Sequence, residues 1–332
     1  MNIYDISKQS GVSIATVSRV INNSGYVAEK TRKKVMEVIE KNSYSPNAFA
    51  RGMSTSSMKT VGILTTNIRD LYQAQCVYYL EQDLKKHGYT AMLCCTGDEQ
   101  AAKKEHVELL ASRSVDALIF IGSHFVEKSE KDNGYIYAAS NHIPVFLLNG
   151  CLSHSNIYSI LCDDEKGCYE LTKCALDHGA KSPYFLATRD TFSVQRKWKG
   201  FKKACKEHDI EIDDSRFRLL EDGFEQLGSQ VFSILQDTDI DAAICVDDEI
   251  ASIVEKVADY CKRKVPRDLQ ITGYNDSIFA KLAHPAISSF DNRTAYMCSQ
   301  AIYGLIQVLE GKEFPEETMY TGKVVLRHST ND

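Results

Sequence analysis

The first chemically distinctive group of side chains lies in the segment GVSIATVSRVINN, from Gly11 to Asn23. Three apolar residues at helical spacing would share one buried stripe: Val17, Val20 and Ile21. The opposite face of the same helix would carry Ile14, Ala15, Ser18 and Arg19. Because this face is made of short side chains and ends in one guanidinium, it suits a helix that enters the major groove of DNA.

The residues around this helix can position it. Asn2 can cap a preceding helix, and Asp5 can return its carboxylate to the free amides of the first turn. Gly11 permits a tight turn, and Ser13 can cap the second helix through its hydroxyl. The pattern predicts a helix-turn-helix.

A third helix is predicted from Thr31 to Asn42, with basic residues on its outer face. Ala28 stands where a capping hydroxyl is expected, a loss of roughly 1 kcal/mol. Residues 1–60 contain nine Lys or Arg against four Asp or Glu, whereas the remainder of the chain contains 30 against 41. A phosphate-binding head on an acidic body explains this separation, and a three-helix core with solvated basic faces is the alternative.

Three consecutive motifs resemble the head and hinge of the lactose-repressor (LacI/GalR) family of bacterial regulators: GVSIATVSRVINN, YVAEKTRKKV from Tyr26 to Val35, and YSPNAFARGM from Tyr44 to Met53. The resemblance implies that Ile14, Ala15 and Arg19 read base edges. Arg19 can bond a guanine through two donors, while Ile14 and Ala15 can contact a thymine methyl. The predicted DNA-binding residues of the head are Ile14, Ala15, Thr16, Ser18, Arg19 and Asn22, of which Thr16 and Ser18 are equally compatible with phosphate contacts or solvated surface.

A short hinge helix is compatible with residues 46–54, but an isolated helix of this length is marginal in water. The resemblance implies that paired hinge helices fold in the minor groove of the operator and insert an apolar side chain into a base step. Met53 stands at the position of the family's leucine and can act as the wedge; an exposed linker residue is the alternative. Asn47, Arg51 and Met53 complete the predicted DNA contacts.

Composition excludes several other classes of protein. No apolar stretch is long enough to span a membrane, and the N-terminus lacks the pattern of a signal peptide, so a cytoplasmic protein is expected. The eleven cysteines and nine histidines are dispersed without ligand spacing, which predicts buried reduced thiols, no metal and no cofactor. The signatures of nucleotide-binding loops and nucleophile elbows are absent, so the chain is not expected to be an enzyme.

From Thr60 onward, short β-rich runs alternate with helical stretches, which predicts parallel sheets covered by helices. The expected organisation is a head over residues 1–45, a hinge and linker over 46–59, and a two-lobed α/β domain over 60–332. Lobe 1 is expected at about 60–158 plus 291–319, and lobe 2 at about 159–290 plus 320–332. The fold class is therefore an all-α helix-turn-helix head plus an α/β two-lobed domain.

Ligands of open α/β sheets bind at the carboxyl ends of the strands. The residues predicted to bind a ligand there are Tyr72, Asp163, Arg196, Lys197, Asp247 and Asn275. Carboxylates, amides and cations suit a hydrogen-bond-rich small molecule. As an alternative, Asp163, Asp247 and Asn275 cap helices, and Trp198 is expected to be a packing residue rather than a stacking platform.

The body is also similar to the lactose-repressor family and to periplasmic sugar-binding proteins (type I), as far as the closing motif VVLRHST, from Val324 to Thr330, which is expected to form a strand. The resemblance implies a homodimer that binds a palindromic double-stranded DNA operator and is controlled by a small-molecule effector, expected to be a carbohydrate. No membrane partner is expected. Lys197 replaces the family's arginine, Asp247 stands where asparagine is common, and Asn275 where aspartate is common. The alternatives are control by a partner protein or a non-sugar metabolite, a solute-binding protein, and an α/β enzyme.

Overall fold

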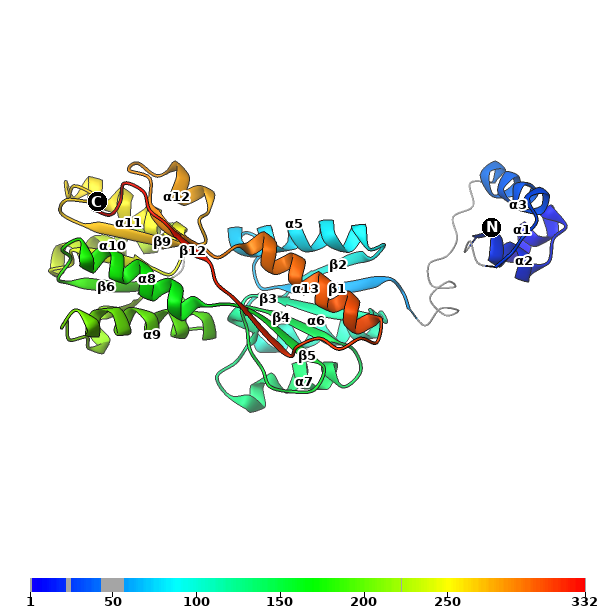
Figure 1. Ribbon diagram of the computed structural model, residues 1–332, viewed down its shortest axis with the longest axis horizontal. Coiled ribbons are helices and arrows are strands. Elements are labelled where there is room, and N and C mark those ends of the chain that lie inside the picture. Colours follow the sequence, from blue (N-terminus) through cyan, green and yellow to red (C-terminus); the bar gives the residue numbers. More distant parts are fainter. Residues whose placement is uncertain (1, 22–24, 43–56, 222, 332) are drawn as a thin grey trace. The chain divides into compact units, whose positions relative to one another are not determined.

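The computed structural model describes residues 2–21, 25–42, 57–221 and 223–331, in two compact units, Met1–Lys59 and Thr60–Asp332 (Figure 1). The described part of the first unit contains α1 (Ile3–Ser10), α2 (Ile14–Ile21) and α3 (Glu29–Lys41). Four buried side chains form its core: Ile6, Val17, Val20 and Val35. The predicted hinge helix, residues 46–54, lies within 43–56, outside the described residues.

The capping pattern of the head agrees with the sequence. Asn2 and Asp5 form a reciprocal capping box at the start of α1. Gly11 has a φ of 62°, a left-handed conformation that other residues adopt with strain. The Ser13 hydroxyl accepts a hydrogen bond from the Thr16 amide at 3.3 Å, and Ala28 precedes α3 without a side-chain cap. Local interactions thus set the angle between α1 and α2.

The second unit consists of two lobes, each with a sheet between helices (Figure 1). The first sheet has the strand order β11-β5-β4-β3-β1-β2, and all its strand pairs are parallel. Its strands are β1 (Thr60–Thr65), β2 (Thr90–Cys95), β3 (Ala117–Ile121), β4 (Val145–Leu148), β5 (Ile157–Cys162) and β11 (Glu317–Tyr320). Its helices are α5 (Leu71–Lys86), α6 (Gln100–Ser112), α7 (Gly134–Ser140) and α13 (Thr294–Leu309), with the short turns η1 (Ser123–Phe125) and η2 (Glu130–Asn133).

The second sheet has the order β12-β10-β9-β8-β6-β7, and only β12 runs antiparallel to its neighbour. Its strands are β6 (Pro183–Ala187), β7 (Phe217–Leu219), β8 (Ala242–Cys245), β9 (Gln270–Tyr274), β10 (Ser288–Asp291) and β12 (Lys323–Val325). Its helices are α8 (Asp164–Asp177), α9 (Phe192–Glu207), α10 (Phe224–Asp237), α11 (Asp248–Tyr260) and α12 (Ile278–Leu282), with the turn η3 (Asp214–Arg216). Strands β3, β4, β6, β8 and β9 are buried along their whole length, as expected for parallel strands covered on both faces.

The expected lobe boundary at residue 159 is wrong by several residues. Strand β5 pairs over its length with β4 and β11, so the first lobe continues to Cys162. The expected closing strand is also too long, since β12 ends at Val325. Beyond it, Ser329 is held by backbone and side-chain hydrogen bonds to Ile271 and Ser288 rather than by a continued ladder.

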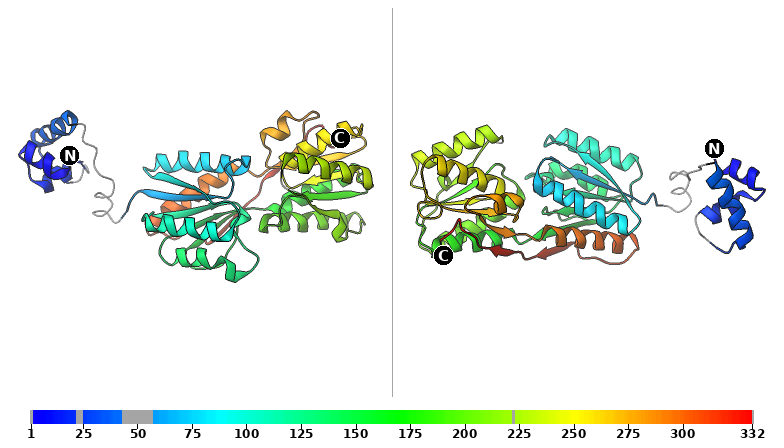
Figure 2. Two further views of the ribbon diagram at one scale, coloured as in Figure 1. Left: turned by 180° about the vertical axis from the view of Figure 1, so that it is seen from behind. Right: turned by 90° about the horizontal axis from the view of Figure 1, so that it is seen from above.

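The chain passes between the lobes after β5, after β10 and after β11. Figure 2 shows α13 and the segment from β11 to β12 along one side of both lobes. None of the helices in the described part of the chain combines the length and apolar character needed to cross a bilayer. The two lobes are therefore joined by three connecting segments.

Candidate functional site

The outer face of α2 carries the predicted base-reading side chains. The Ile14 side chain is 40% exposed, although isoleucine is usually buried. Ala15 and Arg19 are also exposed. Thr16 and Ser18 are half-buried, and the Thr16 hydroxyl hydrogen-bonds to that of Ser13 at 2.9 Å. The helix therefore presents apolar and cationic groups together. Asn22, Asn47, Arg51 and Met53 lie outside the described residues.

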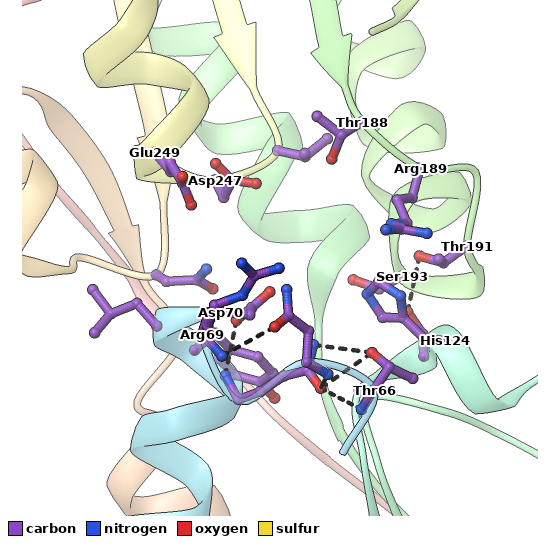
Figure 3. A pocket seen from close by; sticks show the side chains of 18 of the residues that line it. Thr66, Arg69, Asp70, His124, Thr188, Arg189, Thr191, Ser193, Asp247 and Glu249 are labelled. Carbon is purple, nitrogen blue, oxygen red and sulfur yellow. Dashed lines mark hydrogen bonds between the residues drawn. The ribbon is translucent and has the colours of Figure 1, made fainter. Parts of the chain in front are cut away.

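A cavity of about 930 Å³ lies between the two lobes of the second unit. The first lobe contributes residues that follow β1, β2, β3 and β4, and the second lobe contributes residues that follow β6, β8 and β9. Figure 3 shows these polar side chains converging on one space. The carboxyl ends of both sheets thus meet in this cavity, where α/β proteins bind ligands.

Four of the six residues predicted to bind a ligand line the cavity: Tyr72, Lys197, Asp247 and Asn275. Asp163 and Arg196 do not line it, so the structure corrects their placement. Asp163 caps α8 by accepting from the Lys166 amide at 3.3 Å, and it pairs with Arg196 at 3.2 Å. Asp163 lies between β5 and α8, where the chain crosses into the second lobe, and its backbone amide donates to the carbonyl of Tyr320 at the end of β11.

Asp247 combines a capping role with an unusual electrostatic environment. Its carboxylate accepts from the Ile250 amide at 2.8 Å and so caps α11, as the sequence allowed. Burial and the nearby charge of Asp70 raise the pKa of Asp247 to about 7, while Lys197 opposes the shift. This carboxyl can therefore change its charge near neutral pH.

The ammonium of Lys197 is held within the wall of the second lobe. It donates to the Val246 carbonyl at 2.9 Å and lies 3.7 Å from the centre of the Tyr274 ring. The Tyr274 hydroxyl in turn donates to the buried carboxylate of Asp164 at 2.9 Å. Lys197 is 7% exposed, and its ammonium acts on the cavity from within the wall, where it opposes the raised pKa of Asp247.

Tyr72 and Asn275 present polar groups held by neighbours. The Asn149 amide donates to the Tyr72 hydroxyl at 3.0 Å, and burial raises the pKa of Tyr72 well above its usual value. Tyr72 therefore remains a neutral hydroxyl at physiological pH. Asn275 has a φ of 91° and accepts from the Asn292 side chain at 2.8 Å, so it does not cap a helix.

Sequence reasoning missed the loops after β2 and β3 and the first residues after β6, which meet across the cavity. Arg189 pairs with Asp98 at 2.8 Å, Lys128 pairs with Asp190, and the Ser123 hydroxyl donates to Thr191 at 2.9 Å. His124 lies 3.6 Å from Asp98, and its hydrogen bond together with Arg189 lowers the pKa of Asp98. The rule that ligands bind after strands would have found these loops if it had been applied to every strand.

The chemistry available in the cavity is hydrogen bonding and charge. Among the described residues, no group of three or more His, Cys, Asp or Glu could hold a metal ion. All eleven cysteines are free, but only six are buried, so the expectation of buried thiols holds in part. Trp198 stacks on Phe201 at 5.0 Å within the core of the second lobe, as the packing prediction required.

Comparison with known proteins gives two matching families. Residues 2–47 match "Bacterial regulatory proteins, lacI family", and residues 174–330 match "Periplasmic binding protein-like domain". An HTH-type transcriptional regulator of Lachnoclostridium phytofermentans is 38% identical over 332 residues and covers 100% of both chains. Catabolite control protein A of Staphylococcus xylosus is 32% identical over 87% of this chain and 86% of its own.

Solved structures share the whole architecture at low identity. The Lac repressor dimer bound to operator and the anti-inducer ONPF aligns with a TM-score of 0.88 at 20% identity, over 99% of both chains. The transcriptional regulator CelR in complex with cellobiose aligns with a TM-score of 0.73 at 21% identity, also over 99% of both chains. These likenesses establish the fold: a helix-turn-helix head joined to a two-lobed α/β domain.

Proposed function

The chain belongs to the lacI family of bacterial regulatory proteins, and we propose that it represses transcription as a homodimer on a palindromic operator, under the control of a small polar ligand bound between its lobes. As a member of this family it is a DNA-binding transcriptional regulator and not an enzyme. The proposal adds the direction of regulation, the symmetry of the site, and the ligand.

The exposed face of α2 supports the role in reading bases. Ile14, Ala15 and Arg19 are exposed together on a helix whose other face fills the core of the head. One such helix reads only a few base pairs, whereas two heads related by a twofold axis read a palindrome. Specific binding therefore calls for a dimer.

Exposed apolar side chains on the second unit support a homodimer. Tyr78 of α5, Leu93 of the edge strand β2, and Ile278 and Leu282 of α12 are all exposed. In the view of Figure 1, α5 and α12 both lie along the upper edge of this unit, so both lobes contribute to the surface. Exposed edge strands and exposed apolar patches are typical of surfaces that bind a partner. A second copy of this chain would supply the twofold symmetry that a palindrome requires.

The cavity between the lobes supports the proposal that a small polar ligand binds there. Its volume of about 930 Å³ exceeds what a monosaccharide fills, and hydroxyl, amide and carboxylate groups from both lobes line it. A ligand that contacts both lobes would favour one angle between them. In a dimer, that angle sets the spacing of the two DNA-binding heads, and a coupling of about 1 to 3 kcal/mol is enough to control operator binding.

The proposed function can be tested with the full-length protein and an operator duplex selected from random sequence. A thermal-shift screen of sugars, sugar phosphates, amino sugars and nucleobases identifies a ligand, and fluorescence anisotropy then measures operator affinity with and without it. We expect a change in affinity of about 5-fold to 150-fold. If no small molecule shifts the thermal transition, control by a partner protein replaces control by a ligand.

A further inference from the structure

One end of the cavity is acidic on both lobes. Asp70, at the start of α5, belongs to the first lobe, and Asp247 and Glu249, at the start of α11, belong to the second. Figure 3 shows Asp247 and Glu249 on one side of the space and Asp70 on the other. Closure of the lobes therefore brings negative charges toward one another across the cavity.

Neither Asp70 nor Asp247 is in direct contact with a cation among the described residues, although Lys197 opposes the raised pKa of Asp247. Each accepts from one backbone amide, Gln73 N at 2.9 Å for Asp70 and Ile250 N at 2.8 Å for Asp247, and neither forms an ion pair with a described residue. A neutral amide or hydroxyl partner satisfies a carboxylate oxygen but leaves the charge in place. Two such carboxylates in a cavity repel unless a cation lies between them.

Three basic side chains line the cavity, Arg69, Arg189 and Lys197, and two of them are held by other partners. Lys197 donates to the Val246 carbonyl under the Tyr274 ring, and Arg189 pairs with Asp98 in the loops at the other end. Arg69 also lines the cavity beside Asp70 (Figure 3), but it is exposed and forms no ion pair with either carboxylate among the described residues, so solvent screens part of its charge. The place between Asp70 and Asp247 is therefore suited to a positive charge that arrives with the ligand.

Resting on the proposed function, we propose that the ligand carries a protonated amine on a hydroxyl-bearing frame, and that this amine binds between Asp70 of the first lobe and Asp247 of the second. The amine would form charge-assisted hydrogen bonds to the free carboxylate oxygens. Tyr72 and Asn275 would bind hydroxyls of the same ligand. The cation would join the lobes, because it is attracted to a charge on each of them.

Matched ligand pairs test this selectivity on the full-length protein. The probes are glucosamine and galactosamine, with glucose, N-acetylglucosamine, galactose and N-acetylgalactosamine as neutral counterparts. We expect at least one amine to raise the thermal transition and to bind at least 10-fold more tightly than its neutral counterparts by calorimetry. The inference is overturned if a neutral counterpart binds as tightly as its amine, or if none of the amines binds.

Two substitutions and one matched control assign the selectivity to residues. Asp70→Asn and Asp247→Asn retain a capping oxygen, because Asn caps as well as Asp, and each should reduce the preference for the amine at least 10-fold. Asp163→Asn makes the same change at the cap of α8, outside the cavity, and should keep the preference. Equal loss in all three variants would contradict the placement of the amine.

A measurement without ligand tests whether the charge of Asp247 is unfavourable in the folded protein, through burial and through the nearby Asp70. The titratable groups near Asp247 are Asp70 at the cap of α5, Lys197 from α9, Cys245 from β8 and Glu249 from α11. A carboxyl whose folded pKa is about 7, above its unfolded value, destabilises the fold progressively as pH rises from about 4 to 7, and fully above pH 7. Asp247→Asn should therefore melt at a higher temperature than the parent protein at pH 8 and at an equal temperature near pH 4.5. A lower melting temperature at pH 8 would show that the charge of Asp247 is not unfavourable in the folded protein and would contradict an unbalanced acidic end.

The outcomes separate this inference from the proposed function. If a neutral sugar binds more tightly and alters operator affinity, the regulatory function stands and the amine does not. If an amine binds between the carboxylates and leaves operator affinity unchanged, the ligand class stands and the regulatory function fails.

Discussion

The side chain that most directly links this sequence to DNA is Arg19. It is exposed on α2 beside Ile14 and Ala15, on the face opposite the buried Val17 and Val20. A guanidinium in this position can donate two hydrogen bonds to one guanine, and few other side chains can do so. Base discrimination at one position of each half-site should therefore depend on this residue.

Arg19→Ala should weaken operator binding by about 1 to 3 kcal/mol, a factor of about 5 to 150. The loss should be confined to duplexes with the preferred base at one position, because other contacts with phosphates remain. Fluorescence anisotropy on the operator and its single-base variants measures this. Arg19→Lys, which keeps the charge but not the paired donors, is the control, and a uniform loss on all duplexes would contradict base reading.

The residues of the cavity show what sequence could and could not predict. Tyr72, Lys197, Asp247 and Asn275 line the cavity because each follows a strand whose carboxyl end faces the other lobe. Asp163 also follows a strand, but β5 leads directly into the second lobe, so its carboxyl end lies at the crossing. Topology, which the local sequence does not contain, decides between the two outcomes.

At the scale of elements, the close packing of α8 on α9 depends on Gly200. A Cβ at this position would lie 2.0 Å from the Glu165 carbonyl oxygen and 2.8 Å from the Tyr169 amide nitrogen. Both contacts are to backbone, which cannot yield as a flexible side chain can. The two helices can therefore approach only where this residue lacks a side chain.

Gly200→Ala should lower the free energy of unfolding by more than about 3 kcal/mol, because the helices must separate. Gly228 of α10 provides the matched control, because a Cβ there meets nothing within 4 Å. Gly228→Ala should instead stabilise the fold by about 0.5 to 1 kcal/mol. Chemical denaturation measures both, and a stable Gly200→Ala variant would contradict the packing.

The loops after β2, β3 and β6 join the lobes through ion pairs, Arg189 with Asp98 and Lys128 with Asp190. Partly exposed pairs of this kind contribute about 0.2 to 1 kcal/mol each and are weakened by salt. Together they should hold the lobes closer than they would otherwise lie.

Replacing Arg189 and Lys128 together with Gln should increase the radius of gyration of the ligand-free protein in small-angle scattering. High salt should have the same effect on the parent protein. Lys173→Gln is the control, because its partner Asp177 lies in the same helix, α8. A radius that responds to neither salt nor the double substitution would show that these pairs do not hold the lobes together.

Helices were easier to predict from the sequence than the last strands. The predicted helix from Thr31 to Asn42 agrees with α3 within two residues, because apolar spacing is a local signal. Strands β10 and β11, SSFD and ETMY, are short and largely polar and were not predicted. Their positions are fixed by pairing with β9 and β5, which lie far from them in the chain or across a loop.

At the scale of the whole molecule, recognition of a palindrome requires a dimer. Ile278→Glu combined with Leu282→Glu should place charges in the exposed apolar surface of α12 and convert the dimer to a monomer. Operator affinity should fall with it, because one head reads only half a palindrome. Light scattering after gel filtration measures the mass.

The control for this substitution is Leu219→Glu. Leu219 is also exposed and apolar, but it lies on β7, the opposite edge strand of the second sheet from β12. This variant should remain a dimer with normal operator affinity. If it dissociates as readily as the α12 variant, the interface lies elsewhere.

The central claim is that the head recognises a specific palindrome, and one ratio tests it. Full-length protein is titrated at moderate salt against a palindromic duplex selected from random sequence and against a scrambled duplex of the same composition. We predict that the palindrome binds at least about 1,000-fold more tightly, as specific regulators do. A ratio near one would contradict the claim, because the binding would then rest on phosphate charge alone.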